Sequence, residues 1–241
     1  MSDLKPTECN LAAGIFDVDG VLLASPHERA WREALPGFAD PERLTTDLYQ
    51  AHIAGKPRVS GALAALEALG VADAKQRAFA YAECKQKRLE ELIDAGDFAA
   101  FPDAIRFVEA VHALGWPMAV ASSSRNANRM MEAIHLETGR SLLDMFTVNV
   151  CGRDLLRGKP DPEIFLLAAA ELKQPPAKCF VVEDAPAGIE AARAGGMMVV
   201  GVARLHDSDL LLAAGADVVV ASLDEIAIDE LAAGRLCRRA A

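Results

Sequence analysis

Two aspartates stand one residue apart directly after an apolar run, in the stretch GIFDVDGVLL at residues 14–23. Residues two apart in an extended strand point to the same face, so the carboxylates of Asp17 and Asp19 lie close together if the strand continues that far. Two such groups repel each other and need a cation, a proton or water to be tolerated. A solvated Asp-x-Asp-Gly turn explains the motif equally well when it is taken alone, so the rest of the chain must decide.

Polar side chains also occur at three other places where an apolar run ends or a helical pattern begins. They are a hydroxyl and amide cluster, a lysine and a pair of acids: Ser122, Ser123, Ser124 and Asn126; Lys159; and Glu183 with Asp184. Ligands gather at the carboxyl ends of the strands in a parallel α/β sheet. We therefore expect these groups to meet the two aspartates at one edge of the sheet.

This set of groups is suited to phosphoryl transfer. Oxygen-only ligands of high charge favour Mg²⁺, whereas Zn²⁺ prefers histidine or cysteine. One carboxylate can attack phosphorus to give an aspartyl-phosphate, and a second can protonate the leaving oxygen and later activate the acceptor. A metal ion, a lysine and hydroxyl donors can neutralise the charge of the transferred group.

The elements that must position these groups follow an alternating pattern. Continuous apolar runs, rather than alternating ones, predict strands buried on both faces of a parallel sheet, at residues 11–16, 117–121, 146–150, 179–182, 197–202 and 217–220. Helical patterns lie between them, for example at residues 104–114 and 162–172. The alternation predicts a doubly wound, Rossmann-like α/β domain.

Two local signals predict where helices begin. Asp161 can cap a helix whose first turn accommodates Pro162. Ser222 and Glu225 have the spacing of a capping box ahead of a last helix.

Residues 25–100 interrupt the α/β rhythm. They contain no convincing strand but do contain helical patterns, including one at residues 77–95. A helical insertion after the first strand is the simplest explanation. We therefore predict a core formed by residues 1–24 and 100–241, and a helical cap formed by residues 25–99.

Composition and charge limit the classes of partner. The chain has 241 residues, of which 52% are hydrophobic and 25% charged, as is ordinary for a globular protein. Its net charge of −10 gives no attraction to nucleic acid or to an anionic membrane. No apolar stretch reaches the roughly 20 residues of a membrane span, and the first residues do not have the pattern of a secretory signal.

The cysteines indicate a reducing compartment. Five are scattered without CxxC or CxxH spacing, which argues against a disulfide framework or a zinc site: Cys9, Cys84, Cys151, Cys179 and Cys237. We expect a cytoplasmic protein that is a monomer or a weak homo-oligomer.

Four ordered motifs resemble those of the haloacid dehalogenase (HAD) superfamily, and the resemblance covers nearly the whole chain. They are Asp17-Val18-Asp19-Gly20-Val21, Ser122, Lys159-Pro160 and Glu183-Asp184. Each motif alone is weak, but all four in order, each at a strand end or helix entrance, are specific. The resemblance implies a Rossmann-like HAD core, an inserted cap that closes over the site, and Mg²⁺ as cofactor.

The resemblance also implies roles for the four acids. Asp17 would be the nucleophile and a Mg²⁺ ligand. Asp19 would be the general acid/base, with its backbone carbonyl on the metal. Asp184 would be a Mg²⁺ ligand, and Glu183 either a ligand or a partner that acts through water.

The same resemblance assigns the phosphate site. Ser122 would bind the transferred phosphoryl group, and Lys159 would offset its charge and orient the nucleophile. The structural alternatives are a helix cap for Ser122 and a surface charge for Lys159. Three further residues of the core loop are candidate substrate contacts, although such residues are more often caps and turn residues: Ser123, Ser124 and Asn126.

Two cap segments resemble the β-phosphoglucomutase-like branch of the superfamily, His27-Glu28-Arg29-Ala30-Trp31 and Gly55-Lys56-Pro57-Arg58. Lys85 falls near the position of a cap lysine in that branch. The resemblance therefore implies that the cap contacts substrate through His27, Arg58 and Lys85. The structural alternative for His27 is a helix-start residue, and Trp31 fits the cap interior better than a sugar platform.

Two features depart from the family pattern. Ala24 precedes Ser25 where the family often has an Asp-Ser or Asp-Thr pair, and the linker into the cap is about two residues short. A different closure of the cap is expected from this hinge. Extra sequence also lies at residues 137–143, with no assigned purpose.

We therefore expect Mg²⁺-dependent phosphoryl transfer through an aspartyl-phosphate, with hydrolysis of a small sugar phosphate monoester as the leading activity. The main alternative is a β-phosphoglucomutase-type mutase, which returns the phosphoryl group to a reoriented sugar. A 2-haloacid dehalogenase and a phosphonate hydrolase are disfavoured because Asp19 supplies the acid/base of phosphoryl transfer. A non-catalytic binding protein on the same scaffold is also disfavoured because all the chemical residues are retained.

Overall fold

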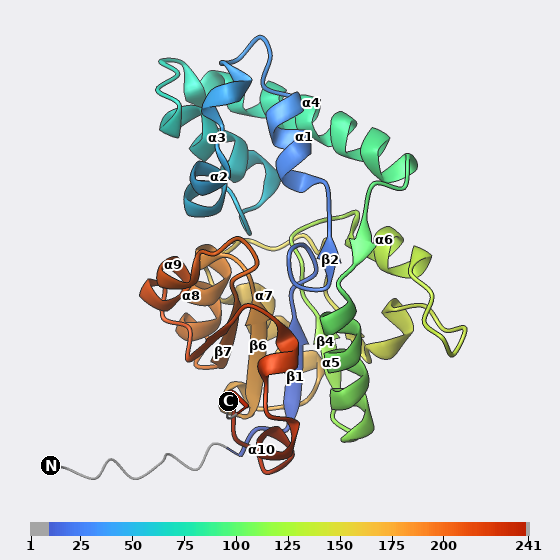
Figure 1. Ribbon diagram of the computed structural model, residues 1–241. Coiled ribbons are helices and arrows are strands. Elements are labelled where there is room, and N and C mark those ends of the chain that lie inside the picture. The colour runs from blue at the N-terminus through green and yellow to red at the C-terminus, as the bar shows by residue number, and fades with distance from the viewer. Residues whose placement is uncertain (1–9, 240–241) are drawn as a thin grey trace, which may run out of the picture.

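A six-stranded parallel sheet forms the centre of the computed structural model, which describes residues 10–239 (Figure 1). The strand order is β5-β4-β1-β6-β7-β8, with the bounds β1 Ala13–Phe16, β4 Met118–Val120, β5 Val148–Asn149, β6 Cys179–Glu183, β7 Met198–Val202 and β8 Val218–Val220. Ile15 of β1 is in register with Ala119 on one side and Val181 on the other. The predicted α/β fold is confirmed, and the strand bounds differ from the predicted ones by at most two residues.

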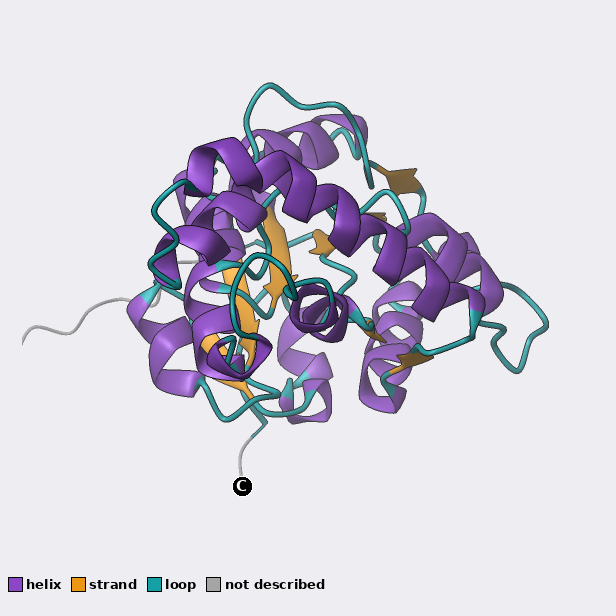
Figure 2. Ribbon diagram, turned by 90° about the horizontal axis from the view of Figure 1, so that it is seen from above, coloured by secondary structure: helices purple, strands orange, loops and turns teal. Residues whose placement is uncertain are grey.

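Helices cover both faces of this sheet (Figures 1 and 2). They are α5 Pro102–Ala113, α6 Ala127–Ala133, α7 Glu163–Glu171, α8 Pro186–Ala194, α9 Ser208–Ala213 and α10 Ile228–Ala232, with short 3-10 helices η2 Leu143–Met145, η3 Pro176–Lys178 and η4 Leu223–Glu225. Adjacent residues of β1, Ile15 and Phe16, belong to different apolar clusters. Successive strand side chains point to opposite faces, so each face of the sheet is buried under its own layer.

Two predicted helix starts are wrong in detail. Helix α7 begins at Glu163, with Pro162 in the N-cap position, and the Asp161 carboxylate instead accepts a 3.1 Å hydrogen bond from the Glu163 N–H. The capping box of Ser222 and Glu225 exists, but it closes η4 and not the last α-helix, which begins only at Ile228. Ser222 caps a single tight turn because Ile226 is already extended.

Four helices of the cap lie beyond the sheet, at the top of Figure 1. They are α1 His27–Glu33, α2 Thr46–His52, α3 Arg58–Ala68 and α4 Ala74–Asp94, with the 3-10 helix η1 Pro41–Arg43. Trp31, Leu66 and Tyr81 are buried in a separate apolar cluster of this region. We keep the proposal that residues 25–99 form the cap and the remaining residues the core.

A two-stranded antiparallel sheet, which we call the hinge, carries the chain into and out of the cap. It pairs β2 Leu23–Ala24 with β3 Ala99–Ala100 and has no counterpart in the sequence analysis. At this end of the cap, Leu89 and Ile93 of α4 belong to the same apolar cluster as Phe16 of the core. The cap is therefore joined to the core by packing at the hinge end.

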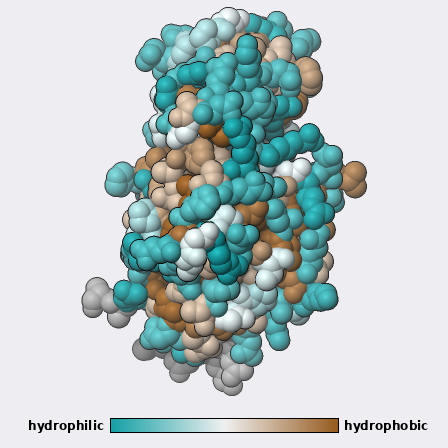
Figure 3. Space-filling model, turned by 90° about the vertical axis from the view of Figure 1, so that its right-hand side faces the viewer, coloured by the Kyte–Doolittle hydropathy of each residue, from teal (hydrophilic) through white to brown (hydrophobic). Residues whose placement is uncertain are grey.

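The remaining features are the surface, the lengths of the helices and the state of the cysteines. Apolar groups are scattered among hydrophilic side chains on the face shown in Figure 3. None of the helices within residues 10–239 combines the length and the apolar character needed to span a membrane. The thiols of Cys84, Cys151, Cys179 and Cys237 are free, whereas Cys9 lies outside the described residues.

Candidate active site

A buried lysine joins two acids at the carboxyl edge of the sheet. Asp17 follows β1, and its N–H donates a 3.0 Å hydrogen bond to the carbonyl of Val182 in the neighbouring strand. Lys159 Nζ lies 2.5 Å from Asp17 Oδ1 and 2.5 Å from Glu183 Oε1, and the lysine side chain is 0% exposed. The structure thus brings together three of the predicted site residues, and the pKa of Lys159 is raised because the attraction of both acids outweighs its burial.

Glu183 uses both of its carboxylate oxygens inside the protein. Oε1 accepts from Lys159, and Oε2 accepts from the N–H groups of Asp184 and Ala185 at 2.9 and 3.0 Å. Gly188 leaves room for this carboxylate, because a Cβ there would lie 1.8 Å from Oε1. Of the two roles expected for Glu183, these contacts favour a partner that holds Lys159 over a direct metal ligand.

Asp19, two residues after Asp17, has one carboxylate oxygen that accepts a hydrogen bond and one that does not. Ser122 Oγ donates a 3.2 Å hydrogen bond to Asp19 Oδ2, while Oδ1 is buried and has no hydrogen-bond partner among the described residues. His27 Nε2 lies 3.5 Å from Oδ1. Burial lowers the pKa of His27 to about 4, against the attraction of Asp19. The imidazole is therefore neutral at pH 7, and Asp19 keeps an oxygen free for a substrate or water proton.

Asp184 packs directly against the turn that carries Asp19. Gly20 has φ +83°, and a Cβ on it would lie 1.8 Å from Asp184 Oδ2, so both the backbone conformation and the space require glycine. Burial raises the pKa of Asp184 well above its ordinary value, as do the charges of Glu183 and Asp17. Burial likewise raises the pKa of Asp17 to about 7, although Lys159 opposes the shift.

These acids fit the predicted Mg²⁺. The carboxylates of Asp17 and Asp184, with the backbone carbonyl of Asp19, would offer an oxygen-only donor set. Burial is the main cause that raises the pKa of both aspartates, and a bound cation would offset the cost of keeping them ionised there. No three His, Cys, Asp or Glu side chains within residues 10–239 form a ready-made metal cluster. Mg²⁺ is commonly held by one or two carboxylates and several waters, so two carboxylates and a carbonyl suffice.

Two of the three predicted cap residues meet at the mouth of this cluster. Lys85 is 3% exposed, with Nζ 3.2 Å from His27 Nδ1 and 5.0 Å from the centre of the Trp31 ring. Burial lowers the pKa of Lys85 to about 7. Arg58, at the start of α3, lies farther out and forms a 2.9 Å ion pair with Glu83.

The core-loop residues line the same space. Ser123 Oγ donates to the carbonyl of Gly55 in the cap at 3.5 Å. Ser124 Oγ accepts from the Asn126 N–H at 3.2 Å and lies 3.4 Å from His27 Nε2. The loop therefore touches the cap as well as forming its own turn.

Cap and core enclose a cavity of about 710 Å³, within the usual range for small-molecule sites. Its lining includes most of the predicted site residues, namely Asp17, Asp19, His27, Arg58, Lys85, Ser122, Ser123, Ser124, Asn126 and Asp184. Lys159 and Glu183 are buried outside this lining, and Lys159 joins Glu183 to Asp17.

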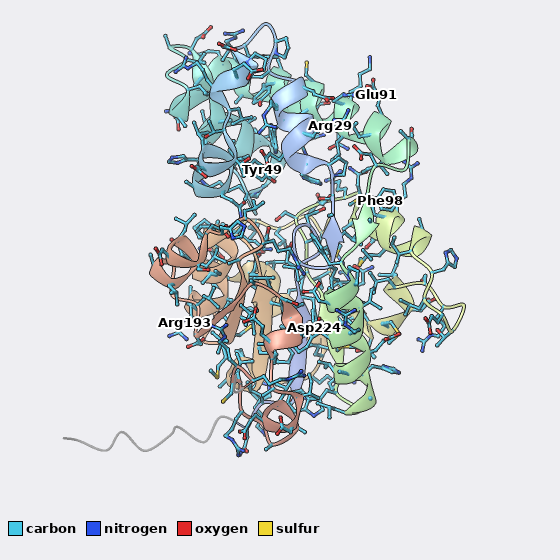
Figure 4. All side chains as sticks on the ribbon, in the orientation of Figure 1. Arg29, Tyr49, Glu91, Phe98, Arg193 and Asp224 are labelled. Carbon is cyan, nitrogen blue, oxygen red and sulfur yellow. The ribbon has the colours of Figure 1, made fainter. Side chains whose placement is uncertain are left out.

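Three residues at this site were not predicted from the sequence. Tyr49 of α2 lies on the side of the cap that faces the core (Figure 4), and burial beside Asp184 and Asp19 raises its pKa. Its neighbour Gln50 donates from Nε2 to the Asp184 carbonyl at 3.0 Å. No local pattern marks these two, because the docking of α2 decides which of its residues face the core. Arg204, two residues beyond β7, could have been found by the strand-end rule.

Comparison with known proteins agrees with this geometry. The family model of the haloacid dehalogenase-like hydrolases matches residues 12–196. A phosphorylated carbohydrates phosphatase of Thermotoga maritima is 32% identical over 215 residues, 87% of this chain and 94% of the relative. A β-phosphoglucomutase of Mycobacterium bovis is 31% identical over 240 residues, 89% and 90% of the two chains.

A solved structure supports the same relationship. The archaeal β-phosphoglucomutase of Pyrococcus sp. strain ST 04 superposes with a TM-score of 0.71 at 32% identity, over 92% of this chain and 97% of that one. Because the family model covers most of the chain and the relatives match over nearly their full length, the family is established. The chain is an enzyme that belongs to the haloacid dehalogenase-like hydrolases, in their β-phosphoglucomutase-like branch.

Proposed function

We propose that this enzyme is a Mg²⁺-dependent phosphatase that hydrolyses a small sugar phosphate monoester through an aspartyl-phosphate on Asp17. The contact of Lys159 with both Asp17 and Glu183, at 2.5 Å each, carries the proposal. It holds one carboxylate oxygen of Asp17, a residue that also lines the cavity. A buried, oriented carboxylate beside a cation is suited to nucleophilic attack on phosphorus.

In the first step, Asp17 Oδ2 attacks phosphorus, and the bond from phosphorus to the sugar oxygen breaks. Asp19 donates its proton to that leaving oxygen, which departs as a hydroxyl group. Ser122 and Lys159 supply donors for the phosphoryl oxygens and for Asp17 Oδ1. Asp17, Asp184 and the Asp19 carbonyl would hold Mg²⁺, which would supply further positive charge against the phosphoryl group.

In the second step, the Asp19 carboxylate accepts a proton from a water molecule whose oxygen attacks the phosphorus. The bond between phosphorus and Asp17 Oδ2 breaks, which releases inorganic phosphate and restores both aspartates. Oδ1 of Asp19 supports this double role, because it accepts no hydrogen bond from the described residues and has only His27 Nε2 beside it, at 3.5 Å.

The substrate class rests on the cavity and on the relatives. A cavity of about 710 Å³ is large enough for a sugar phosphate. Its cap side presents the neutral His27 and the amine of Lys85 to the leaving group. The Thermotoga maritima relative is named a phosphatase of phosphorylated carbohydrates, which supports the same class for this chain.

A mutase remains the second candidate because the cap contacts the core tightly beside the site. A Cβ on Gly158 would lie 1.9 Å from Pro57 Cγ of the cap, and one on Gly55 would lie 3.2 Å from Ala185 Cβ. A mutase must keep water from the aspartyl-phosphate, and such close contact of glycine backbone with side chains of the facing part supports exclusion of water. The named β-phosphoglucomutase relatives support this candidate too.

Phosphate release and product analysis test the proposal. Purified enzyme is incubated with p-nitrophenyl phosphate and a panel of sugar phosphates, with Mg²⁺ or with EDTA. We expect turnover only with Mg²⁺, and loss of at least about a thousandfold in D17N. Sugar phosphate isomers formed only when a bisphosphate primer is added would instead establish the mutase, and undiminished turnover in D17N would refute the nucleophile.

A further inference from the structure

The guanidinium of Arg204 holds the turn that follows the first strand. Arg204 Nε donates to the carbonyl of Gly20 at 3.0 Å, and Nη2 donates to the carbonyl of Val21 at 3.0 Å. These two residues directly follow Asp19 in the chain. A planar guanidinium that binds two successive carbonyls fixes both their position and their orientation.

The turn also has hydrogen bonds of its own, but they leave those two carbonyls to Arg204. The carbonyl of Val18 accepts from the N–H groups of Leu22 and Leu23, at 2.9 Å each. The Gly20 N–H donates to the carbonyl of Leu23 at 2.8 Å. On its other side Gly20 meets Asp184, so the turn is held between the guanidinium and that carboxylate.

Arg204 is itself fixed before any ligand binds. Its Nη1 donates to Asp103 Oδ2 at 3.1 Å, and this oxygen also accepts from the Leu223 N–H at 2.8 Å and from Ser222 Oγ at 3.1 Å. The guanidinium lies over the ring of Phe101 at 3.7 Å from its centre. The arginine side chain is only 15% exposed, so it is a preorganised support rather than a mobile surface cation.

Asp19 needs such a support because its carboxylate has few contacts of its own. One oxygen receives the 3.2 Å hydrogen bond from Ser122. The other has no hydrogen-bond partner among the described residues, and only His27 Nε2 lies beside it, at 3.5 Å. The backbone on either side must therefore set where this carboxylate stands. General acid/base catalysis depends on that placement to within hydrogen-bond reach of the transferred proton.

We propose that Arg204 is a positioning residue for Asp19, which it aligns for proton transfer by fixing the carbonyls of Gly20 and Val21. The inference rests on the proposed phosphatase function and extends it to a residue outside the four family motifs. Because Arg204 acts through the general acid, its loss should matter most where the leaving oxygen needs a proton. A phenol needs that proton more than p-nitrophenol does, because p-nitrophenolate is the more stable anion.

The first test compares kcat/KM for phenyl phosphate and p-nitrophenyl phosphate. In R204M, we expect kcat/KM for phenyl phosphate to fall about tenfold more than for p-nitrophenyl phosphate, within the range of one misplaced acid. R204K keeps the positive charge but loses the planar guanidinium with its paired donors. Its kcat/KM values should therefore lie between those of wild type and R204M. R106M is the matched control, since Arg106 forms an exposed ion pair with Asp224 away from the turn, and it should leave both values unchanged.

A double mutant separates this role from a structural one. If Arg204 acts through Asp19, then R204M should add less than about threefold to the loss already present in D19N. Equal losses on both substrates, full additivity with D19N, or a rise in KM alone would each overturn the proposal. The last outcome would make Arg204 a substrate contact instead.

Hydrogen exchange gives a readout that does not depend on activity. The Leu22 and Leu23 amides close the turn, so their exchange should speed up at least about tenfold in R204M and stay unchanged in R106M. Unchanged exchange in R204M would overturn the proposal even if activity fell. If wild-type enzyme hydrolysed neither phosphate, the proposed function would fail, while exchange would still decide whether Arg204 holds the turn.

Discussion

Gln50 of the cap donates a 3.0 Å hydrogen bond from Nε2 to the backbone carbonyl of Asp184 in the core. The same atom lies 2.9 Å from Asp207 Oδ2, and Gln50 is 5% exposed. A single cap side chain thus connects two core loops, one of which carries a proposed Mg²⁺ ligand. Seating of the cap and placement of Asp184 are therefore coupled.

Removal of this amide should weaken catalysis through the cap. Q50L loses both hydrogen bonds and leaves the Asp207 carboxylate without its donor, so kcat/KM for a sugar phosphate should fall about tenfold, or about 1.4 kcal/mol. The Mg²⁺ concentration for half-maximal activity should rise in the same variant. Q76L, an equivalent change at an exposed position of α4, is the control, and equal behaviour of the two variants would contradict the coupling.

A methyl group at Gly20 should impair the active site in addition to straining the backbone. G20A and G37A both place alanine at positive φ, at +83° and +87°, which costs about 1 kcal/mol or more in each. Only the Gly20 Cβ would clash with Asp184, whereas nothing lies within 4 Å of the Gly37 Cβ. We expect G20A to lose Mg²⁺-dependent turnover and to unfold at lower temperature than G37A, as measured by calorimetry and phosphate release.

Mg²⁺ should stabilise the protein more at high pH than at low pH. Burial raises the pKa of Asp17 from its ordinary 3.8 to about 7, so the folded protein keeps a proton that the unfolded chain has released. Metal-free stability should therefore fall as the pH rises from about 4 through about 7. Mg²⁺ binds the ionised carboxylates. The melting temperature with Mg²⁺ should therefore exceed that with EDTA by more at pH 8 than at pH 5. Equal increments would show that protons do not compete with the metal.

Lys85 should lower the stability of the folded protein near and below pH 7, while it supports activity. Burial lowers its pKa to about 7, so below pH 7 the folded protein holds a buried cation, and wild-type stability should rise as the pH increases from 7 toward the lysine's ordinary 10.5. Urea unfolding should therefore show K85M gaining relative to wild type at pH 6 and losing that gain by pH 10. Its kcat/KM should fall because His27 loses its 3.2 Å neighbour. K87M, exposed on the same helix, should show neither effect, and a pH-independent difference for K85M would contradict the prediction.

The core of the site could be predicted because strand ends share one edge of a parallel sheet. Asp17 and Asp184 each follow an apolar run, and this rule alone brings them together. Lys159 was expected at a helix entrance, and the fold places it in contact with Asp17. The family likeness added roles, such as that of Asp19, which the residues alone did not assign.

Contacts that depend on how one part docks on another could not be predicted. Gln50 meets Asp184 only because α2 presents that face to the core, and no spacing in the sequence records the docking angle. The pairing of β2 with β3 was missed because two-residue strands leave no periodic pattern. The capping box of Ser222 was identified correctly but given to the wrong helix, since a local motif reports a turn and not the length of helix that follows.

The cap contacts the core at two places, and only the contact at the hinge end is a shared apolar cluster. Leu89 and Ile93 lie at the hinge end of the cap and pack among core side chains with Phe16. The loop with Gly55 and Pro57 contacts the core at a separate place, against Ala185 and Gly158. In a rigid rotation, displacement grows with distance from the axis. A rotation of the cap about its hinge end would therefore move this loop away from Gly158 more than it would disturb the packing around Leu89 and Ile93.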